Sequence, residues 1–112
     1  MVKNSYIPDR QDIVWVDLDP SRGHEQACVR PALVLSREAY NKKTGLMIAC
    51  AITSHETGYP FEVSVRGKTM AGVILTDQIR TLDWKCRKVR FIEKTSSDVM
   101  GEVEAKIQAL LF

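Results

Sequence analysis

The sequence predicts a mostly β domain in which an antiparallel sheet is closed by one C-terminal helix. Three observations support this prediction. Short segments rich in β-branched and aliphatic residues alternate with turn residues along most of the chain. One segment alternates cleanly between apolar and polar residues, as a strand with one buried face does. A helical spacing of apolar residues is found in the last part of the chain.

The length and composition of the chain favour one compact domain over residues 1–112. Of these 112 residues, 45% are hydrophobic, and domains commonly hold roughly 100 to 150 residues. No apolar run approaches the roughly 18 residues that cross a bilayer, and the first residues lack the apolar core of a signal peptide. We therefore expect a cytoplasmic protein that does not enter a membrane. Three cysteines without a C-x-x-C pair favour reduced thiols over a disulfide framework.

The expected strands follow one another along the chain, each bounded by Pro, Gly, Asn or Asp. They cover residues 12–18, 31–36, 46–53, 61–66, 72–82 and, as a shorter strand, 89–92. Two connections, NKKTG at 41–45 and RGK at 66–68, have the chemistry of hairpin turns, with a glycine available for positive φ. An antiparallel arrangement follows from such connections.

The tail SSDVMGEVEAKIQALLF is predicted to form an amphipathic helix. Its apolar stripe consists of Val99, Val103, Ile107, Leu110 and Leu111. Thr95 stands three positions before Asp98, which is an acidic variant of the capping box, and acidic residues crowd the first turns. Gly101 costs the helix roughly 1 kcal/mol relative to alanine, which packing on the sheet can offset.

Polar side chains are concentrated in the connection 19–30, which has no helix or strand pattern of its own. Among them are His24, Glu25, Gln26 and Arg30. Loops of about a dozen residues are uncommon in small domains and are usually functional or disordered. Because Pro31 is rigid and opens a strand, the sheet sets the direction of the Arg30 guanidinium.

The spacing of residues argues against metal and thiol chemistry. His24 and His55 stand apart, without an H-x-H, H-E-x-x-H or carboxylate cluster, so we expect no metal and no other cofactor. Cys28 close to His24 is a weak signal for a nucleophilic thiol. The remaining candidates are cationic and hydroxyl side chains, which can stabilise negative charge on a phosphate.

Arg30 offers planar, bidentate donors on a permanent charge, and Thr53 and Ser54 at the end of a strand can add hydroxyl donors. A surface ion pair for Arg30 and a turn role for Thr53 are the alternatives. The net charge of +2 is a weak sign of a polyanionic partner. The densest basic cluster, Lys85–Arg90, follows shortly after Arg80, although such a run by itself is usually a solvated surface.

The order of these motifs resembles the MazF/PemK toxins of bacterial toxin–antitoxin pairs. The resemblance is carried by DIVWVDLDPSRGHEQACVRPALVLS, ACAITS, GYPFEV and GVILTDQIRTLDW, which span nearly the whole chain. The G-H-E-Q loop followed by R-P-A-x-V-L-S is specific. The resemblance implies an SH3-like antiparallel barrel with a C-terminal helix. It also implies a ribosome-independent endoribonuclease that cuts single-stranded RNA, including mRNA, without a metal.

The resemblance also assigns roles to individual residues. The catalytic arginine falls on Arg30 and the catalytic threonine on Thr53, while Glu25 matches the acid of the loop. The residues expected to contact substrate are His24, Gln26, Ser54, Asp77, Gln78 and Arg80. In the PemK branch the aspartate of the D-Q-x-[RK] strand is catalytic, but an arginine stands two positions before it, where this chain has Leu75. The MazF branch therefore fits better.

Such an enzyme uses the 2′-hydroxyl of the RNA as nucleophile and leaves a 2′,3′-cyclic phosphate and a 5′-hydroxyl. On physical grounds Glu25 or His24 is a better general base than Arg30, because an arginine side chain does not give up its proton readily, and the choice stays open. The segment 54–58 and the connection 19–30 are expected to set the cleavage sequence.

Two partners besides RNA are expected. One is a second copy of the chain, with Trp15, Leu82 and Trp84 as candidate contacts in a homodimer. The other is a MazE-like antitoxin whose acidic tail orders over the basic groove. The alternative functions are a gyrase poison of the same fold, like CcdB, and a non-catalytic RNA-binding barrel. The CcdB family ends in Trp-Gly-Ile, whereas this chain ends in ALLF.

Overall fold

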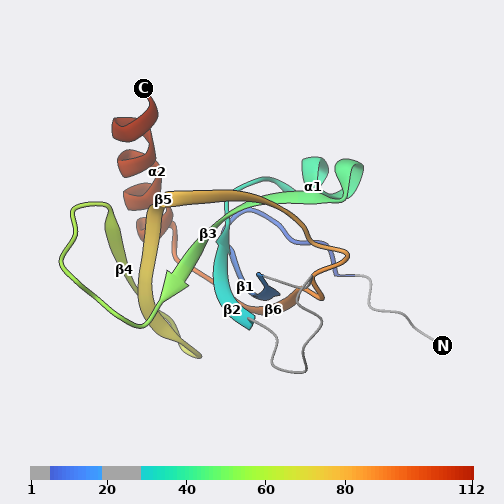
Figure 1. Ribbon diagram of the computed structural model, residues 1–112, viewed down its shortest axis with the longest axis horizontal. Helices are drawn as coiled ribbons and strands as arrows, with labels where there is room; N and C mark the ends of the chain where they lie inside the picture. The colour runs from blue at the N-terminus through green and yellow to red at the C-terminus, as the bar shows by residue number, and fades with distance from the viewer. Residues whose placement is uncertain (1–5, 19–28) are drawn as a thin grey trace.

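The structure is a computed structural model that describes residues 6–18 and 29–112 (Figure 1). Its elements are β1 (Asp12–Asp17), β2 (Val29–Val34), α1 (Glu38–Thr44), β3 (Leu46–Thr53), β4 (Glu62–Arg66), β5 (Ala71–Asp83), β6 (Arg90–Lys94) and α2 (Ser97–Leu111). All six expected strands are present, with β3 at the predicted ends and the ends of the others shifted by no more than two residues.

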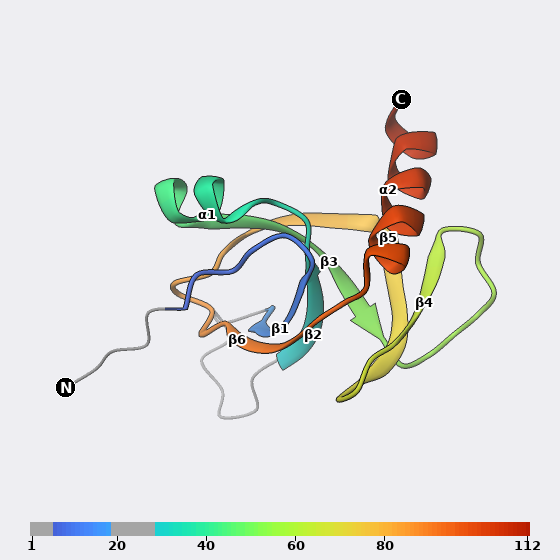
Figure 2. The ribbon, with the colours of Figure 1, turned by 180° about the vertical axis from the view of Figure 1, so that it is seen from behind.

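The strands form one curled sheet in the order β4-β5-β3-β2-β1-β6, with antiparallel pairing throughout. Figures 1 and 2 show the sheet bent into an open barrel, with α2 standing beside β4 and β5. The mostly β, barrel-like fold with a C-terminal helix is thus confirmed. Among the described residues, no helix is both long and apolar enough to span a bilayer.

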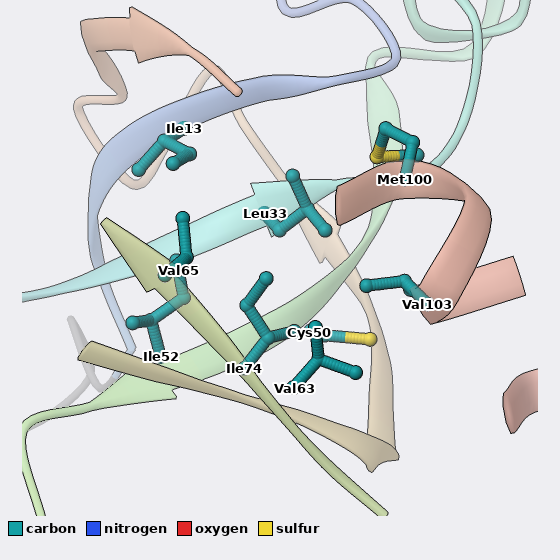
Figure 3. Packing of buried hydrophobic residues seen from close by; sticks show 9 residues of the cluster. All are labelled: Ile13, Leu33, Cys50, Ile52, Val63, Val65, Ile74, Met100 and Val103. Atoms are coloured by element: carbon teal, nitrogen blue, oxygen red, sulfur yellow. The ribbon is translucent and has the colours of Figure 1, made fainter. Parts of the chain in front are cut away.

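Both faces of the central strands are buried. Neighbouring residues such as Ile13 and Val14, or Leu33 and Val34, belong to two different core clusters on opposite sides of the sheet. One cluster lies between the sheet and α2, and Figure 3 shows Met100 and Val103 of α2 directed toward its strand residues. This burial explains why the central strands read as continuous apolar runs. The edge strand β4 shows the clean alternation instead.

The connection at 41–45 is not a hairpin turn, and this prediction was wrong. These residues form most of α1, and Gly45 adopts the predicted positive φ, 75°, as the residue that ends the helix. The backbone N–H of Glu38 donates to Asp9 Oδ1 at 2.8 Å. Because the group that caps this helix stands far upstream in the sequence, the local pattern does not reveal it.

Asn41 anchors α1 to the rest of the fold. Its side chain is fully buried, and its Nδ2 donates to the carbonyl of Pro8 at 2.7 Å. Its Oδ1 accepts a hydrogen bond from Ser36 Oγ at 2.6 Å, and its carbonyl accepts one from Trp84 Nε1 at 2.9 Å. A buried amide with its hydrogen bonds satisfied therefore fixes this corner.

The helix α2 begins one residue later than predicted. Its N-cap is Ser96, whose Oγ accepts from Val99 N at 3.2 Å, rather than Thr95. Thr95 instead ties the chain to the sheet, since its backbone N–H donates to the carbonyl of Gln11 at 2.9 Å. Of the predicted stripe, Val103 is buried, whereas Leu110 and Leu111 are exposed.

Candidate functional site

The ladder between β2 and β3 stops before either strand ends. Its pairs are Ala32 with Ala51, Leu33 with Cys50, and Val34 with Ala49. The next residue of β2 is Pro31, which has no N–H to donate. β3 also shifts register against β5 between Cys50 and Ile52. Beyond this point β2 stays paired with β1, and β3 stays paired with β5, so the sheet opens into a fork.

A cavity of about 520 Å³ lies in this fork. It is lined by Trp15, Val29, Arg30, Pro31, Ile52, Thr53, Ser54, Met70 and Ala71. If the ladder continued in register, Arg30 would stand opposite Thr53. The structure therefore brings together Arg30, Thr53 and Ser54, which the sequence analysis singled out separately. We call this space the fork cavity.

Arg30 is exposed, and its Nη1 donates to the neighbouring carbonyl of Val29 at 3.0 Å. Within residues 6–18 and 29–112, the ion pairs join Arg10 to Glu104 and Lys94 to Asp12. Neither involves Arg30, so this part of the chain does not support the alternative that Arg30 is a surface ion pair.

Thr53 has the turn role that is the alternative interpretation of its place at a strand end. Its Oγ1 accepts a hydrogen bond from the backbone N–H of His55 at 3.2 Å, as in a turn that follows a strand. A hydroxyl that accepts in this way keeps its own proton for donation. Thr53 can therefore shape the turn and still donate to a ligand in the fork cavity. Ser54 beside it is exposed.

The apolar wall of the fork cavity could not be predicted from the sequence. Trp15 is 37% exposed and stands opposite Pro31 in the β1–β2 ladder. On its other side it pairs with Arg90, which belongs to the predicted basic cluster. Opposite residues of an antiparallel ladder share a face of the sheet, so Arg90 adds a positive charge near the cavity. The pairing of β1 with β2 places Trp15 at the cavity, and this register is known only from the fold.

The other two candidate dimer contacts differ from Trp15. Leu82 is 2% exposed and belongs to the core cluster inside the barrel, against which Trp84 packs. Within this fold Leu82 is therefore a core residue rather than a surface contact. Its polar neighbours on β5, Thr81 and Asp83, are exposed, as the alternation of a strand requires.

Asp77, Gln78 and Arg80 lie on β5 and do not line the fork cavity. β5 meets the cavity at Ala71, whereas Arg80 stands opposite Ala49 in the β3–β5 ladder. The neighbouring carboxylate of Asp77 raises the pKa of the Tyr59 hydroxyl. Substrate binding by these three residues stays a prediction, for RNA that extends beyond the cavity.

The connection from β3 to β4, which begins with Ser54, is held by side chains at its far end. The carboxylate of Glu62 accepts hydrogen bonds from Thr57 Oγ1 at 2.7 Å and from Gly58 N at 3.0 Å. The hydrogen bond from the Thr57 hydroxyl is the main cause of a lowered pKa at Glu62. Lys106 Nζ of α2 donates to the carbonyl of Pro60 at 2.6 Å.

The predicted loop residues Glu25, His24 and Gln26 lie outside the described residues, as does Cys28. In the part of the chain that the structure describes, no three His, Cys, Asp or Glu side chains are grouped as metal ligands. The described share of the candidate site therefore consists of a guanidinium, two hydroxyls and an indole around one cavity.

Comparisons with known proteins identify the family of the chain. A family model described as "PemK-like, MazF-like toxin of type II toxin-antitoxin system" matches residues 9–111. The Endoribonuclease toxin MazF of Escherichia coli (strain K12) is 41% identical, over 95% of this chain and 96% of that protein. Endoribonuclease PemK of Escherichia coli is 31% identical, over 99% and 87%.

Solved structures lead to the same family. The crystal structure of MazF (Form-I) from Deinococcus radiodurans has a TM-score of 0.85 and 46% identity, covering 96% of this chain and 98% of that one. A MazE-MazF structure (Form-II) from the same organism has a TM-score of 0.85 and 42% identity, covering 96% and 97%. The chain therefore belongs to the PemK-like, MazF-like toxins of type II toxin–antitoxin systems.

Proposed function

We propose that this toxin is an endoribonuclease that cuts single-stranded RNA in the fork cavity, with the 2′-hydroxyl of the RNA as nucleophile. The observation that carries the proposal is that Arg30 and Thr53, which lie on two strands that separate, line the same cavity. Endoribonuclease activity itself agrees with the names of the curated relatives.

The reaction needs three operations on atoms of the RNA. A base removes the 2′-hydroxyl proton, the 2′-oxygen bonds to phosphorus, and the bond from phosphorus to the 5′-oxygen breaks as an acid protonates that oxygen. The products are a 2′,3′-cyclic phosphate and a 5′-hydroxyl. Because the nucleophile belongs to the substrate, no metal-bound water is required.

Arg30 and Thr53 suit the stabilisation of the phosphorane. The guanidinium offers a permanent charge and two parallel donors to two non-bridging oxygens. The Thr53 hydroxyl adds a donor from the opposite strand, and preorganised donors of this kind lower the barrier where charge develops. Glu25 and His24 are the candidate groups for proton transfer, and the choice between them stays open.

The remaining predicted residues contact the RNA on either side of the cut. His24, Gln26 and Ser54 are adjacent to the catalytic groups in the sequence. Asp77, Gln78 and Arg80 lie further along the sheet, where they can bind flanking nucleotides. The connections 19–30 and 54–58 set the cleavage sequence.

Two protein partners complete the proposal. The MazE-MazF structures from Deinococcus radiodurans support an antitoxin partner, and we assign to it an acidic segment that covers the RNA groove. A homodimer is proposed because so small a domain presents little groove alone. Exposed apolar residues at the end of α2, Leu111 and Phe112, are available for protein contacts.

We place the protein in the cytoplasm, where its RNA substrate is found.

The test uses purified protein and a long single-stranded transcript. We expect cleavage that EDTA does not slow, and fragments with a 2′,3′-cyclic phosphate and a 5′-hydroxyl, measured by mass spectrometry. An oligonucleotide with a 2′-deoxy nucleotide 5′ to the cut should resist cleavage at that position but still compete for binding. Cleavage at the modified position, or a 5′-phosphate on the product, would show that water attacks instead.

A further inference from the structure

The carboxylate of Glu93 joins two parts of the sheet that no ladder connects. Glu93 lies on β6, at one edge of the sheet, and the edge strand β4 lies at the other. Its Oε1 accepts from Lys68 N at 2.9 Å, and its Oε2 accepts from Thr69 N and Met70 N, each at 3.1 Å. Three consecutive N–H groups of the turn between β4 and β5 thus converge on one side chain.

These hydrogen bonds are charge-assisted at neutral pH. Partial desolvation acts to raise the pKa of Glu93, but the N–H groups of Thr69, Lys68 and Met70, together with the charge of Lys68, lower it below the ordinary value. Hydrogen bonds to an ionised acceptor are roughly twice as strong as neutral ones. The tie between Glu93 and the turn is therefore strong for a surface contact.

The two ends of this tie differ in how they are supported. At the β6 end, Glu93 pairs with the fully buried Ile13. At the other end, the turn is closed by Gly67 N donating to the carbonyl of Met70 at 2.8 Å. A Cβ on Gly67 would collide with the Glu93 carboxylate, so a larger residue at this position would force that side chain to shift. This is the reason for the glycine of the predicted RGK turn, whose φ is not positive.

The turn that Glu93 holds is one wall of the fork cavity. Met70 and Ala71 line that cavity together with Arg30 and Thr53. On its other side, Gly67 and Lys68 line a second cavity of about 620 Å³. The side chain of Met70 packs against the core cluster beside α2, whereas Gly67, Lys68 and Thr69 are exposed. The hydrogen bonds to Glu93 therefore fix the part of the turn that side-chain packing does not hold.

We propose that Glu93 is a positioning residue for RNA cleavage, which holds the 67–70 turn so that Met70 and Ala71 bound the substrate beside Arg30 and Thr53. This role rests on the proposed function. Since Glu93 contacts the turn and not the reacting atoms, its loss weakens the fit of the bound RNA more than it slows the chemical step.

The test compares Glu93→Ala with Asp83→Ala. Asp83 is a matched control, because its Oδ1 accepts from Lys85 N at 3.0 Å and Cys86 N at 3.2 Å in a turn at the opposite end of β5. With a fluorescent oligonucleotide that contains a mapped cut, we expect Glu93→Ala to raise KM about tenfold and to change kcat less than about threefold. Asp83→Ala should leave KM unchanged.

Two further measurements separate positioning from general stability. Amide hydrogen exchange at Lys68, Thr69 and Met70 should rise in Glu93→Ala but not in Asp83→Ala. Glu93→Gln keeps one acceptor oxygen, so its KM should lie between those of the wild type and Glu93→Ala. An unchanged KM in Glu93→Ala, or an equal rise in Asp83→Ala, would overturn the role while the wild type still cleaves RNA. A wild-type protein that cleaves no RNA would overturn the proposed function and this role with it.

Discussion

Arg30 on β2 and Thr53 on β3 each stand two residues beyond the last ladder pair of these strands, Ala32 with Ala51. The ladder has no pair at these positions, and both residues line a cavity instead. A ligand entering the cavity therefore meets a guanidinium from one strand and a hydroxyl from the other.

Replacing Arg30 should remove activity and leave the fold intact. The side chain is exposed, so Arg30→Ala should keep its far-UV circular dichroism and Tm while cleavage falls below detection. Arg30→Lys should restore little, because an ammonium lacks the bidentate fork. Arg37→Ala, at an exposed position before α1, controls for the loss of one positive charge. Near-normal cleavage by Arg30→Ala would leave an RNA-binding barrel as the better interpretation.

Removing the Thr53 hydroxyl should have a smaller effect. Thr53→Ala loses one donor to the phosphorane, which corresponds to about 1 to 3 kcal/mol in the barrier. Thr53→Ser keeps the hydroxyl and should retain most of the activity. The measurement is single-turnover cleavage with enzyme in excess. Equal rates for the Ala and Ser variants would show that the hydroxyl does not take part.

Gln11 offers a test of backbone strain. Its φ is 86°, in the left-handed region, while its Nε2 donates to the carbonyl of Thr95. An alanine keeps the unfavourable φ and loses the hydrogen bond, whereas a glycine loses the hydrogen bond and relieves the strain. We expect Gln11→Gly to exceed Gln11→Ala in free energy of unfolding by about 1 kcal/mol, measured by urea titration. Equal free energies of unfolding for the two variants would show that the positive φ at position 11 does not cost stability.

Stability should depend on pH through Glu62. The hydrogen bond from Thr57 is the main reason that its pKa lies below the ordinary 4.5. A pKa lowered by folding contributes stability that is present above the unfolded pKa and is lost as the pH falls through the folded one. The difference in Tm between the wild type and Glu62→Gln should therefore shrink from about pH 6 to about pH 3.

The control for this comparison is Glu102→Gln, which removes a charge from an exposed position on α2. A Tm difference for Glu62→Gln that is independent of pH, or that matches the control, would show that the ionised carboxylate of Glu62 does not stabilise the loop.

The described thiols should differ in reactivity. Burial, with a smaller contribution from Asp77, raises the pKa of Cys50 to about 12, and its side chain is fully buried. Cys86 is exposed. At about pH 8, iodoacetamide should label Cys86 in the native protein, and Cys50 only after denaturation, because the thiolate is the nucleophile. Peptide mass spectrometry measures each site, and native labelling of Cys50 would show that this part of the core opens.

The strands could be predicted from the sequence because apolar runs bounded by turn residues are local signals. The helix α1 could not, since its N-terminal acceptor is Asp9 and its anchor is the buried amide of Asn41. Among site residues, Arg30, Thr53 and Ser54 carry recognisable chemistry and a motif. Three other residues carry no such signal: Trp15, Met70 and Glu93. Their roles depend on the pairing register of the strands and on the approach of β6 to the turn between β4 and β5.

The early end of the β2–β3 ladder links the stability of the sheet to the size of the fork cavity. Further backbone pairing beyond Pro31 would strengthen the sheet and at the same time fill the space in which we propose that RNA is cut. A change that lengthened the ladder should therefore raise the free energy of unfolding and lower the cleavage rate. Under the proposed function, Pro31 marks a position at which greater stability and greater activity require opposite changes.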